Sequence, residues 1–446
     1  MRVIVIGAGD VGRHIAATLS GERHDVTVID IDPERVDAMQ GDLDALVMTG
    51  NGASPKFLRS IGAHEADLLC AVTESDEVNV IAALAAHQLG AKRTVARVRD
   101  DEYYEPNESS TRDLLGIDFV IHPERATADD LAEAILLPGA VHVEYFADGR
   151  VGVAECILSM RSPLVGAPLR ERRIVRPSEV VALMREGRPV PADPGHKPKV
   201  GDHLLVAAAR SDLGPVIAQI AGYTTKVHDV VLFGAGRVGL PLARRLEAEE
   251  RFRITLMERD AERARFVAEQ LPHTTVLHEE GIAKDVLLAQ GVDRVGVFAA
   301  CAGDDRANLL AALHAKQLGA GLCLAVVSRE EYMPLVDALE IDAAFSPRLV
   351  TAEAILRSVR GENVHAMHLL WGGAEILEVA VEGGCLADGK TIDATRTMAR
   401  TRPVAIVRDR RVLMPDDDLR IEGGDRVLVF NTRQGVADVR RVFGLA

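Results

Sequence analysis

A short apolar run followed by a glycine-rich turn occurs twice in this chain of 446 residues, and this repeat constrains the fold more than any other feature. The first copy runs from Val3–Ile6 into Gly7–Gly12, and the second runs from Val230–Phe233 into Gly234–Gly239. Each turn has the pattern GxGxxG. A short, largely β-branched run predicts a strand buried on both faces of a parallel sheet, and the turn after it is typical of dinucleotide-binding βα units.

The glycines of the first turn suit the backbone that such a unit needs. Gly7 allows the tight turn, Gly9 lets the backbone approach a pyrophosphate, and Gly12 lets the following helix pack closely on the strand. The helix, predicted over about Val11–Leu19, directs its N-terminal amides and the positive end of its dipole at the phosphates. The turn therefore predicts a phosphate-binding site.

An acidic residue ends the second strand of each copy. Val26–Ile29 leads into Asp30, and Ile254–Met257 leads into Glu258. Both acids follow their glycine turn by about 20 residues, the spacing at which a carboxylate meets the ribose hydroxyls of a dinucleotide. A GxGxxG pattern alone is a weak signal, but here strand, helix, second strand and acid occur in register twice. This context favours a ligand site over a glycine-rich turn that binds nothing.

The remainder of the first repeat predicts an α/β fold with a Rossmann-like, doubly wound parallel sheet. Strands alternate with helices at the spacing of βαβ units. In such sheets a ligand lies outside the carboxyl ends of the strands, where Asn51, Thr73 and Arg97 fall. Arg97 would suit a phosphate through its charge and its planar donor fork. The further strands are expected at Ala45–Thr49, Asp67–Val72, Thr94–Val98 and Phe119–Ile121.

A small α+β domain is expected after each large one. Beyond Gly139 the pattern changes to antiparallel strands joined by short turns, and a proline-rich stretch that includes Pro189 and Pro191 predicts a surface loop. The same order returns in the second half, where the fourth strand is expected at Asp293–Ala299. The chain is therefore predicted to be a tandem duplication of four segments, residues 1–125, 140–224, 228–348 and 363–446.

The two copies of the large domain differ at the expected ligand site. The positions of Thr73 and Arg97 hold Ala302 and Val326 in the second copy, so a hydroxyl and a cation are lost there. The position of Asp10 holds Arg237, and Gly50-Asn51 is replaced by Glu279-Glu280. Our hypothesis is that the first half holds the dinucleotide and that the second site is degenerate or differently selective.

Composition excludes several classes of function. The formal net charge of −15 argues against nucleic acid, whose phosphates need basic patches. The five cysteines are scattered, which predicts neither a disulfide framework nor a metal site, and we expect no metal. No apolar stretch approaches the ~20 residues that span a bilayer. The first strand begins at Arg2, so we expect no signal peptide and a cytoplasmic location.

Several motifs together resemble the RCK (KTN) domain family. They are the GAGDVG turn with Asp30, the Gly50-Asn51-Gly52 segment, Val72–Asn79 with the sequence VTESDEVN, and Ala96–Arg99 with the sequence ARVR. The duplicated order of large and small domains over the whole chain is similar to that of the tandem RCK regulatory subunits of bacterial potassium uptake systems. That order is more specific than any single motif.

The resemblance implies that the large domains are Rossmann N-lobes that bind NAD(H), and in some members ATP or ADP. It implies C-lobes that help to assemble a homo-oligomeric gating ring, commonly a tetramer, on a membrane potassium-translocating subunit such as a TrkH-like protein. The subunit would then be peripheral on the inner face of the membrane. With the turn and strand ends above, the expected cofactor-binding residues are Gly7, Ala8, Gly9, Asp10, Val11, Gly12, Asp30, Asn51, Thr73, Glu74 and Arg97, and in the second half Gly234, Ala235, Gly236, Arg237, Val238 and Glu258.

The alternative is an NAD-dependent oxidoreductase. Such an enzyme needs a proton donor or acceptor placed at the nicotinamide, usually from a catalytic domain. The appended domains are small, and their polar residues show no Ser/Tyr/Lys, His/Asp or metal-ligand pattern. We therefore predict a binding module without catalytic residues.

Overall fold

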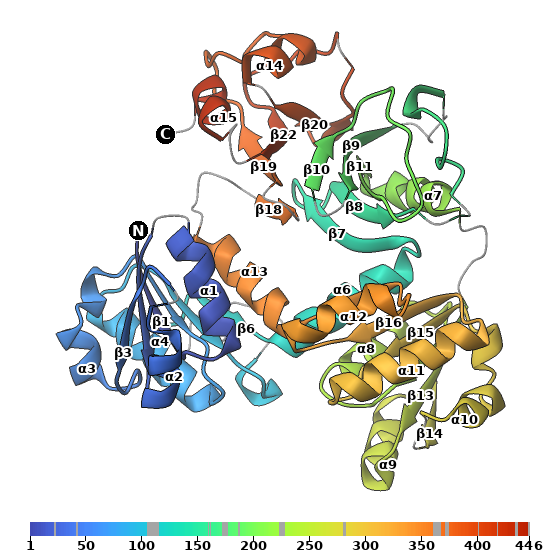
Figure 1. Ribbon diagram of the computed structural model, residues 1–446. Helices are drawn as coiled ribbons and strands as arrows, with labels where there is room; N and C mark the ends of the chain where they lie inside the picture. The colour runs from blue at the N-terminus through green and yellow to red at the C-terminus, as the bar shows by residue number, and fades with distance from the viewer. Residues whose placement is uncertain are drawn as a thin grey trace. The chain divides into compact units, whose positions relative to one another are not determined.

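The computed structural model consists of two compact units (Figure 1). The first unit combines Met1–Asp129 with Asp229–Val359, and the second combines Asp130–His228 with Arg360–Ala446. The large domains of the two halves thus share one unit and the small domains share the other. The structure describes residues 1–21, 24–41, 43–104, 116–158, 160, 162–171, 177–185, 188–222, 228–279, 282–359, 367–370, 374–399, 401–416, 418–432 and 436–444.

The first large domain is a six-stranded parallel sheet with the strand order β3-β2-β1-β4-β5-β6. The order reverses between β1 and β4, which is the point where doubly wound sheets bind ligands. The predicted Rossmann-like sheet is therefore confirmed. Its strands are β1 Arg2–Ile6, β2 Asp25–Asp30, β3 Leu46–Thr49, β4 Leu68–Ala71, β5 Thr94–Arg97 and β6 Phe119–Ile121.

Helices connect these strands, and side-chain caps fix where several of them begin. Asp32 accepts a hydrogen bond from the Glu34 amide at the start of α2, and Ser75 accepts one from the Val78 amide at the start of α4. The helical elements are α1 Asp10–Gly21, α2 Pro33–Met39, α3 Pro55–Ser60, η1 Ala63–Glu65, α4 Asp76–Leu89, η2 Asp101–Tyr103 and α6 Pro123–Leu136. Along α6 the chain passes from the first unit to the second.

The second large domain repeats this sheet in the order β14-β13-β12-β15-β16-β17. Its fourth strand begins at Val297 and not, as expected, at Asp293, because a 3-10 turn occupies Val292–Arg294 after Gly291, whose φ is 72°. The strands are β12 Asp229–Phe233, β13 Arg253–Glu258, β14 Thr274–His278, β15 Val297–Ala300, β16 Leu322–Val326 and β17 Ala343–Phe345. The helical elements are α8 Gly239–Glu247, α9 Ala261–Gln270, α10 Lys284–Ala289, η4 Val292–Arg294, α11 Asp305–Leu318, η5 Glu330–Tyr332, α12 Met333–Ala338 and α13 Pro347–Val359.

Helix α13 links the two large domains within this unit. It follows the last strand of the second sheet and packs against α1, the helix that opens at the first glycine turn (Figure 1). The contact brings together segments more than 300 residues apart in the sequence. The second half therefore lies close to the expected nucleotide site of the first.

The second unit contains two five-stranded antiparallel sheets, with the orders β10-β9-β11-β8-β7 and β18-β19-β22-β20-β21. The loop expected at Pro189 and Pro191 is instead the edge strand β10, a position that proline tolerates because one side of the strand has no partner. The first sheet comprises β7 Ala140–Phe146, β8 Val151–Ile157, β9 Ser178–Arg185, β10 Arg188–Pro191 and β11 His203–Ala209, with η3 Leu169–Glu171 and α7 Arg210–Ala221. The second comprises β18 Met367–Leu370, β19 Ala374–Ala380, β20 Arg402–Arg408, β21 Arg411–Leu413 and β22 Arg426–Thr432, with α14 Ile392–Ala399 and α15 Val436–Phe443.

The two antiparallel sheets share one hydrophobic core, in which Phe146 and Val153 of the first pack with Ile376, Val404 and Phe430 of the second. Ion pairs join the same sheets at the margin of this core. They are Arg402 with Glu179 at 2.6 Å and Arg426 with Asp148 at 2.7 Å, and Glu378 also accepts a hydrogen bond from the Ala147 amide at 2.8 Å. The small domains of the two halves thus form one body.

Within the residues that the structure describes, no helix is both long and apolar enough to cross a bilayer. Glu280 and the expected domain limits at residues 224, 363 and 446 lie outside the described residues.

Candidate nucleotide site

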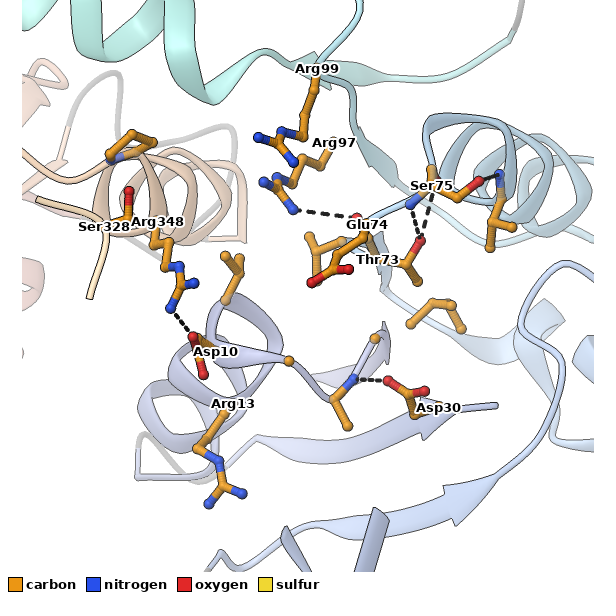
Figure 2. Close-up of a pocket in the computed structure, with 18 of the residues that line it drawn as sticks. Asp10, Arg13, Asp30, Thr73, Glu74, Ser75, Arg97, Arg99, Ser328 and Arg348 are labelled. Carbon is orange, nitrogen blue, oxygen red and sulfur yellow. Dashed lines mark hydrogen bonds and ion pairs between the residues drawn. The ribbon is translucent and has the colours of Figure 1, made fainter. Parts of the chain in front are cut away.

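A cavity of about 1070 Å³ lies at the carboxyl ends of the strands of the first unit (Figure 2). It brings together most of the residues expected from the sequence, and it takes them from both halves of the chain. The expected residues that line it are Gly7, Ala8, Gly9, Asp10, Val11, Asp30, Asn51, Thr73, Glu74 and Arg97 of the first half, with Gly236, Arg237 and Val238 of the second. Gly12, Gly234, Ala235 and Glu258 are not among its lining residues.

Gly12 acts one layer behind the cavity wall. A Cβ atom at this position would lie 1.9 Å from the carbonyl oxygen of Gly7, so only glycine allows α1 to begin so close to the turn. Gly239 has the same relation to Gly234, again at 1.9 Å. The sequence-based role of the third glycine as a packing residue is therefore confirmed in both copies.

Asp30 is held in place by the turn that it faces. It is 8% exposed, and its Oδ2 accepts a hydrogen bond from the Ala8 amide at 2.6 Å (Figure 2). Its Oδ1 accepts one from the Asp32 amide at 2.9 Å. Each carboxylate oxygen has a second lone pair, so the group can still accept bonds from ligand hydroxyls. Its orientation is thus fixed before any ligand arrives.

The second copy has the same arrangement. Glu258 accepts hydrogen bonds from the Ala235 amide at 2.8 Å and from the Asp260 amide at 2.9 Å. The glycine turn and the acid of the second half have therefore kept their local geometry, although Glu258 does not line the cavity.

Asn79 ends the VTESDEVN segment, but sequence reasoning gave it no role in the site. It is fully buried on α4 and fastens the ends of β4 and β5. Its Oδ1 accepts from the amide and the hydroxyl of Thr73 at 2.8 and 2.7 Å, and its Nδ2 donates to the carbonyls of Thr73 and Arg97 at 3.0 and 2.8 Å. Asn308 makes the three corresponding backbone bonds to Ala302 and Val326 in the second copy, where the hydroxyl partner is missing.

Arg97 projects into the cavity from the end of β5 (Figure 2). Its Nη1 donates to the carbonyl of Thr73 at 3.3 Å, while its buried Nε has no hydrogen-bond partner among the described residues. Burial lowers the pKa of this guanidinium, and the carboxylate of Glu124 opposes that shift. A guanidinium that is aimed into a cavity with donor capacity to spare is suited to an anionic ligand.

Other charged residues of the cavity were missed by sequence reasoning. Arg99 and Glu124 form an ion pair at 2.7 Å. Arg348 of α13 forms one with Asp10 (Figure 2). Arg99 could have been found from its place just beyond the β5 strand end. Arg348 could not, because only the packing of α13 on α1 brings it to the first site.

The second half also lines the cavity, with residues that lack the polar side chains found at the corresponding positions of the first half. Ala302 and Val326, the counterparts of Thr73 and Arg97, line the same cavity as Arg237. The cavity wall is thus polar on the side of the first half and mostly apolar on the other, apart from Arg237, Ser328 and Arg348. Among the residues described, no group of three or more His, Cys, Asp or Glu side chains could hold a metal ion.

Comparison with known proteins places the chain in a family. The TrkA-N domain model matches residues 3–123 and 230–347, and the TrkA-C domain model matches residues 376–444. A protein of Halomonas elongata named Trk system potassium uptake protein TrkA is 33% identical over 452 residues, covering 99% of this chain and 98% of the relative. The chain belongs to the TrkA family. A relative of the same name from Azorhizobium caulinodans is 32% identical, also covering 99% of this chain and 98% of its own.

Solved structures share the fold of this TrkA-family chain. The GsuK RCK domain has a TM-score of 0.65 at 18% identity, covering 100% of this chain and 95% of that one. The GsuK channel bound to NAD has a TM-score of 0.65 at 18% identity, covering 100% of this chain and 79% of that one. The resemblance to tandem RCK domains predicted from the sequence is therefore confirmed for the fold.

Proposed function

We propose that the chain is a cytoplasmic regulatory subunit that binds NAD(H) in the cavity of its first unit and gates a membrane potassium-uptake protein. The observation that carries the proposal is the cavity itself. It joins a glycine turn, an oriented carboxylate at Asp30 and the cation of Arg97, whose Nε has no partner in the part of the chain that the structure describes. These are the groups that a pyrophosphate and a ribose require.

Different residues of the site would bind different parts of the dinucleotide. The amides of Gly7–Val11 and the N-terminus of α1 hold the pyrophosphate, and Asp30 accepts from the ribose hydroxyls. Asn51, Thr73 and Glu74 complete the rim at the strand ends, and Arg97 pairs with a phosphate. No catalytic group is assigned.

NAD is supported as the ligand by the GsuK channel, which shares this fold and whose solved structure has NAD bound. A further structure, of GsuK bound to ADP, has a TM-score of 0.51 at 14% identity and covers 80% of this chain and 69% of that one. We therefore propose that adenine nucleotides, ADP or ATP, compete for the same cavity.

We propose that one nucleotide binds per chain, at the first turn. The second turn, Gly234–Val238 with Glu258, keeps its local geometry. However, Ala302 and Val326 offer neither the hydroxyl nor the cation of their counterparts, and Gly236–Val238 line the cavity of the first half. The second half then acts as the far wall of the first site. We propose that the four segments of the duplication are separate domains, with limits at 1–125, 140–224, 228–348 and 363–446.

We propose that the position of the cavity couples nucleotide binding to gating. A ligand shifts a conformational equilibrium only by its differential affinity for the two states. A ligand between the two large domains contacts both, so its occupancy can favour one packing of α13 on α1 over another. In a homo-oligomeric ring, which we propose is a tetramer, that change would act on a TrkH-like membrane subunit.

The acidic chain would bind at the inner face of the membrane. Its net charge of −15 complements the basic cytoplasmic loops that membrane proteins carry. The relatives named as potassium uptake proteins support a potassium-translocating partner.

The first experiment is a calorimetric titration of the full chain with NAD, NADH, ADP and ATP. We expect one tight dinucleotide per chain. Asp30→Ala should weaken it by at least tenfold, whereas the matched variant Glu258→Ala should change the affinity less than threefold. Two equal sites, or an equal loss in both variants, would overturn the single-site proposal. Substrate-dependent NADH turnover would instead favour the oxidoreductase.

The second experiment tests the partner. The chain is added to proteoliposomes that contain a TrkH-like subunit, and potassium flux is recorded with and without NADH. We expect nucleotide-dependent flux that Asp30→Ala abolishes, and membrane binding that weakens with added salt. A potassium flux that is the same with and without the chain, and with and without the nucleotide, would refute the gating role.

A further inference from the structure

An ion pair joins the two large domains beside the first glycine turn. Arg348, the second residue of α13, binds the carboxylate of Asp10, the first residue of α1, and both side chains line the cavity (Figure 2). The side chain of Asp10 is 63% exposed and that of Arg348 is 34% exposed. The pair is therefore open to solvent from the cavity and can be reached by a ligand.

The position of Asp10 has an electrostatic cost for a phosphate ligand. The N-terminus of α1 favours negative charge, and Asp10 already supplies one there. A ligand phosphate at the same helix end would meet this carboxylate as a like charge. Arg348 offsets the repulsion only while it stays close, and the ligand competes with Asp10 for it.

The charge of the cavity, with Asp10 and Arg348 included, is close to balanced. Among the residues that the structure describes, its wall carries five carboxylates and six guanidinium groups, so a change of one charge alters the balance markedly. These groups are Asp10, Asp30, Asp32, Glu74 and Glu124 against Arg13, Arg35, Arg97, Arg99, Arg237 and Arg348. Asp10 is the one that sits within the phosphate-binding turn itself, whereas the corresponding position of the second turn is the cation Arg237.

We propose that the Asp10–Arg348 pair determines which nucleotide the cavity prefers, by disfavouring ligands with more phosphate charge. This inference rests on the proposed nucleotide-binding function. A dinucleotide spreads a small charge over two phosphates, whereas ATP brings a more highly charged triphosphate to the same helix end. The carboxylate of Asp10 therefore penalises ATP more than NAD, and Arg348 reduces the penalty.

The test compares affinities for NAD, ADP and ATP in the full chain. Asp10→Asn removes the penalty and frees Arg348, and we expect the ratio of ATP to NAD affinity to rise about fivefold to tenfold, with ADP between them. Arg348→Gln leaves Asp10 uncompensated and should lower the same ratio. The double variant should return close to the wild-type ratio.

Asp37→Asn is the matched control, because it removes one carboxylate from an exposed position of α2 that does not line the cavity. The ratio of ATP to NAD affinity in this variant should stay within twofold of the wild-type ratio. Added salt should shrink the effect of Asp10→Asn, since the pair is partly exposed. Melting temperatures of all variants show whether each one folds.

The outcomes separate this inference from the function on which it rests. Normal NAD binding with an unchanged ATP to NAD ratio in Asp10→Asn would overturn the inference alone. A shift in the same direction for Asp10→Asn and Arg348→Gln would also overturn it. If the wild-type chain bound no nucleotide at all, the proposed function would fail and this inference with it.

Discussion

Asn79→Ala should both destabilise the first large domain and damage the nucleotide site. The substitution removes the side-chain amide of Asn79. Three backbone groups then lose their hydrogen-bond partner: the N–H and the carbonyl of Thr73 and the carbonyl of Arg97. A buried polar group left without a partner costs about 1–3 kcal/mol. Thr73 is only half-buried, so water can replace part of what is lost, and the lower end of that range applies to each group. We expect a loss of about 3 kcal/mol in the free energy of unfolding.

Asn308→Ala is a matched control, because Asn308 is equally buried and makes the corresponding three bonds to the backbone of Ala302 and Val326. Its loss of stability should be similar. The two variants should differ in ligand binding. Asn79 positions Thr73 and Arg97, whereas Asn308 positions residues that offer a ligand only methyl groups and backbone. NAD affinity should fall at least tenfold in Asn79→Ala and less than threefold in Asn308→Ala.

Urea denaturation of each variant measures the stability, and calorimetry at a temperature where both remain folded measures the affinity. A stability change below about 1 kcal/mol in Asn79→Ala would refute the hydrogen-bond argument. An equal fall of NAD affinity in both variants would show that Asn79 acts through the stability of the unit and not by positioning the site.

An ion pair, a close glycine contact and the burial of the cysteines lead to three more predictions. Arg185→Gln should cost about 1 kcal/mol at pH 6, and the difference should begin to shrink below about pH 4 in pH-dependent urea melts. Burial raises the pKa of Asp202, but hydrogen bonds from Arg185 and from the Lys199 amide outweigh this effect, and the net pKa is lowered. Because the folded pKa is lowered, the ion pair stabilises the fold at neutral pH and this stabilisation is lost as the pH falls. Gly12→Ala should abolish NAD binding and lower the melting temperature, because its Cβ would meet the Gly7 carbonyl at 1.9 Å; wild-type affinity would refute the close packing. Cys385 should be the first of the five thiols to react with a thiol reagent under native conditions, since the other four are buried; rapid modification of all five would contradict that burial.

The fold of each large domain was predictable because its signals are local. An apolar run, a GxGxxG turn and an acid about 20 residues later specify strand, turn and second strand within one short segment. The structure confirms both parallel sheets and the packing role of Gly12. Element limits were predicted less accurately, as at Val292–Arg294, because a 3-10 turn and a strand start have similar local sequences there.

The composition of the site was only partly predictable. The sequence placed Asp30, Thr73 and Arg97 at strand ends, and the structure brings them together around one cavity. It did not indicate that Asn79 fastens these ends, since the VTESDEVN segment that contains Asn79 does not show which backbone groups its side chain reaches. Nor did it show that Arg237 and Arg348 would share the cavity with the first turn.

The sequence by itself determined the duplication, the two Rossmann-like sheets and the carboxylate that ends the second strand of each. These features depend on residue spacings within one βαβ segment, which periodicity and turn chemistry encode directly. The tertiary structure alone decided that the two large domains form one unit, that α13 packs on α1, and that Arg348 reaches Asp10. Such contacts join residues hundreds of positions apart, and they depend on how whole apolar faces fit together rather than on any local pattern.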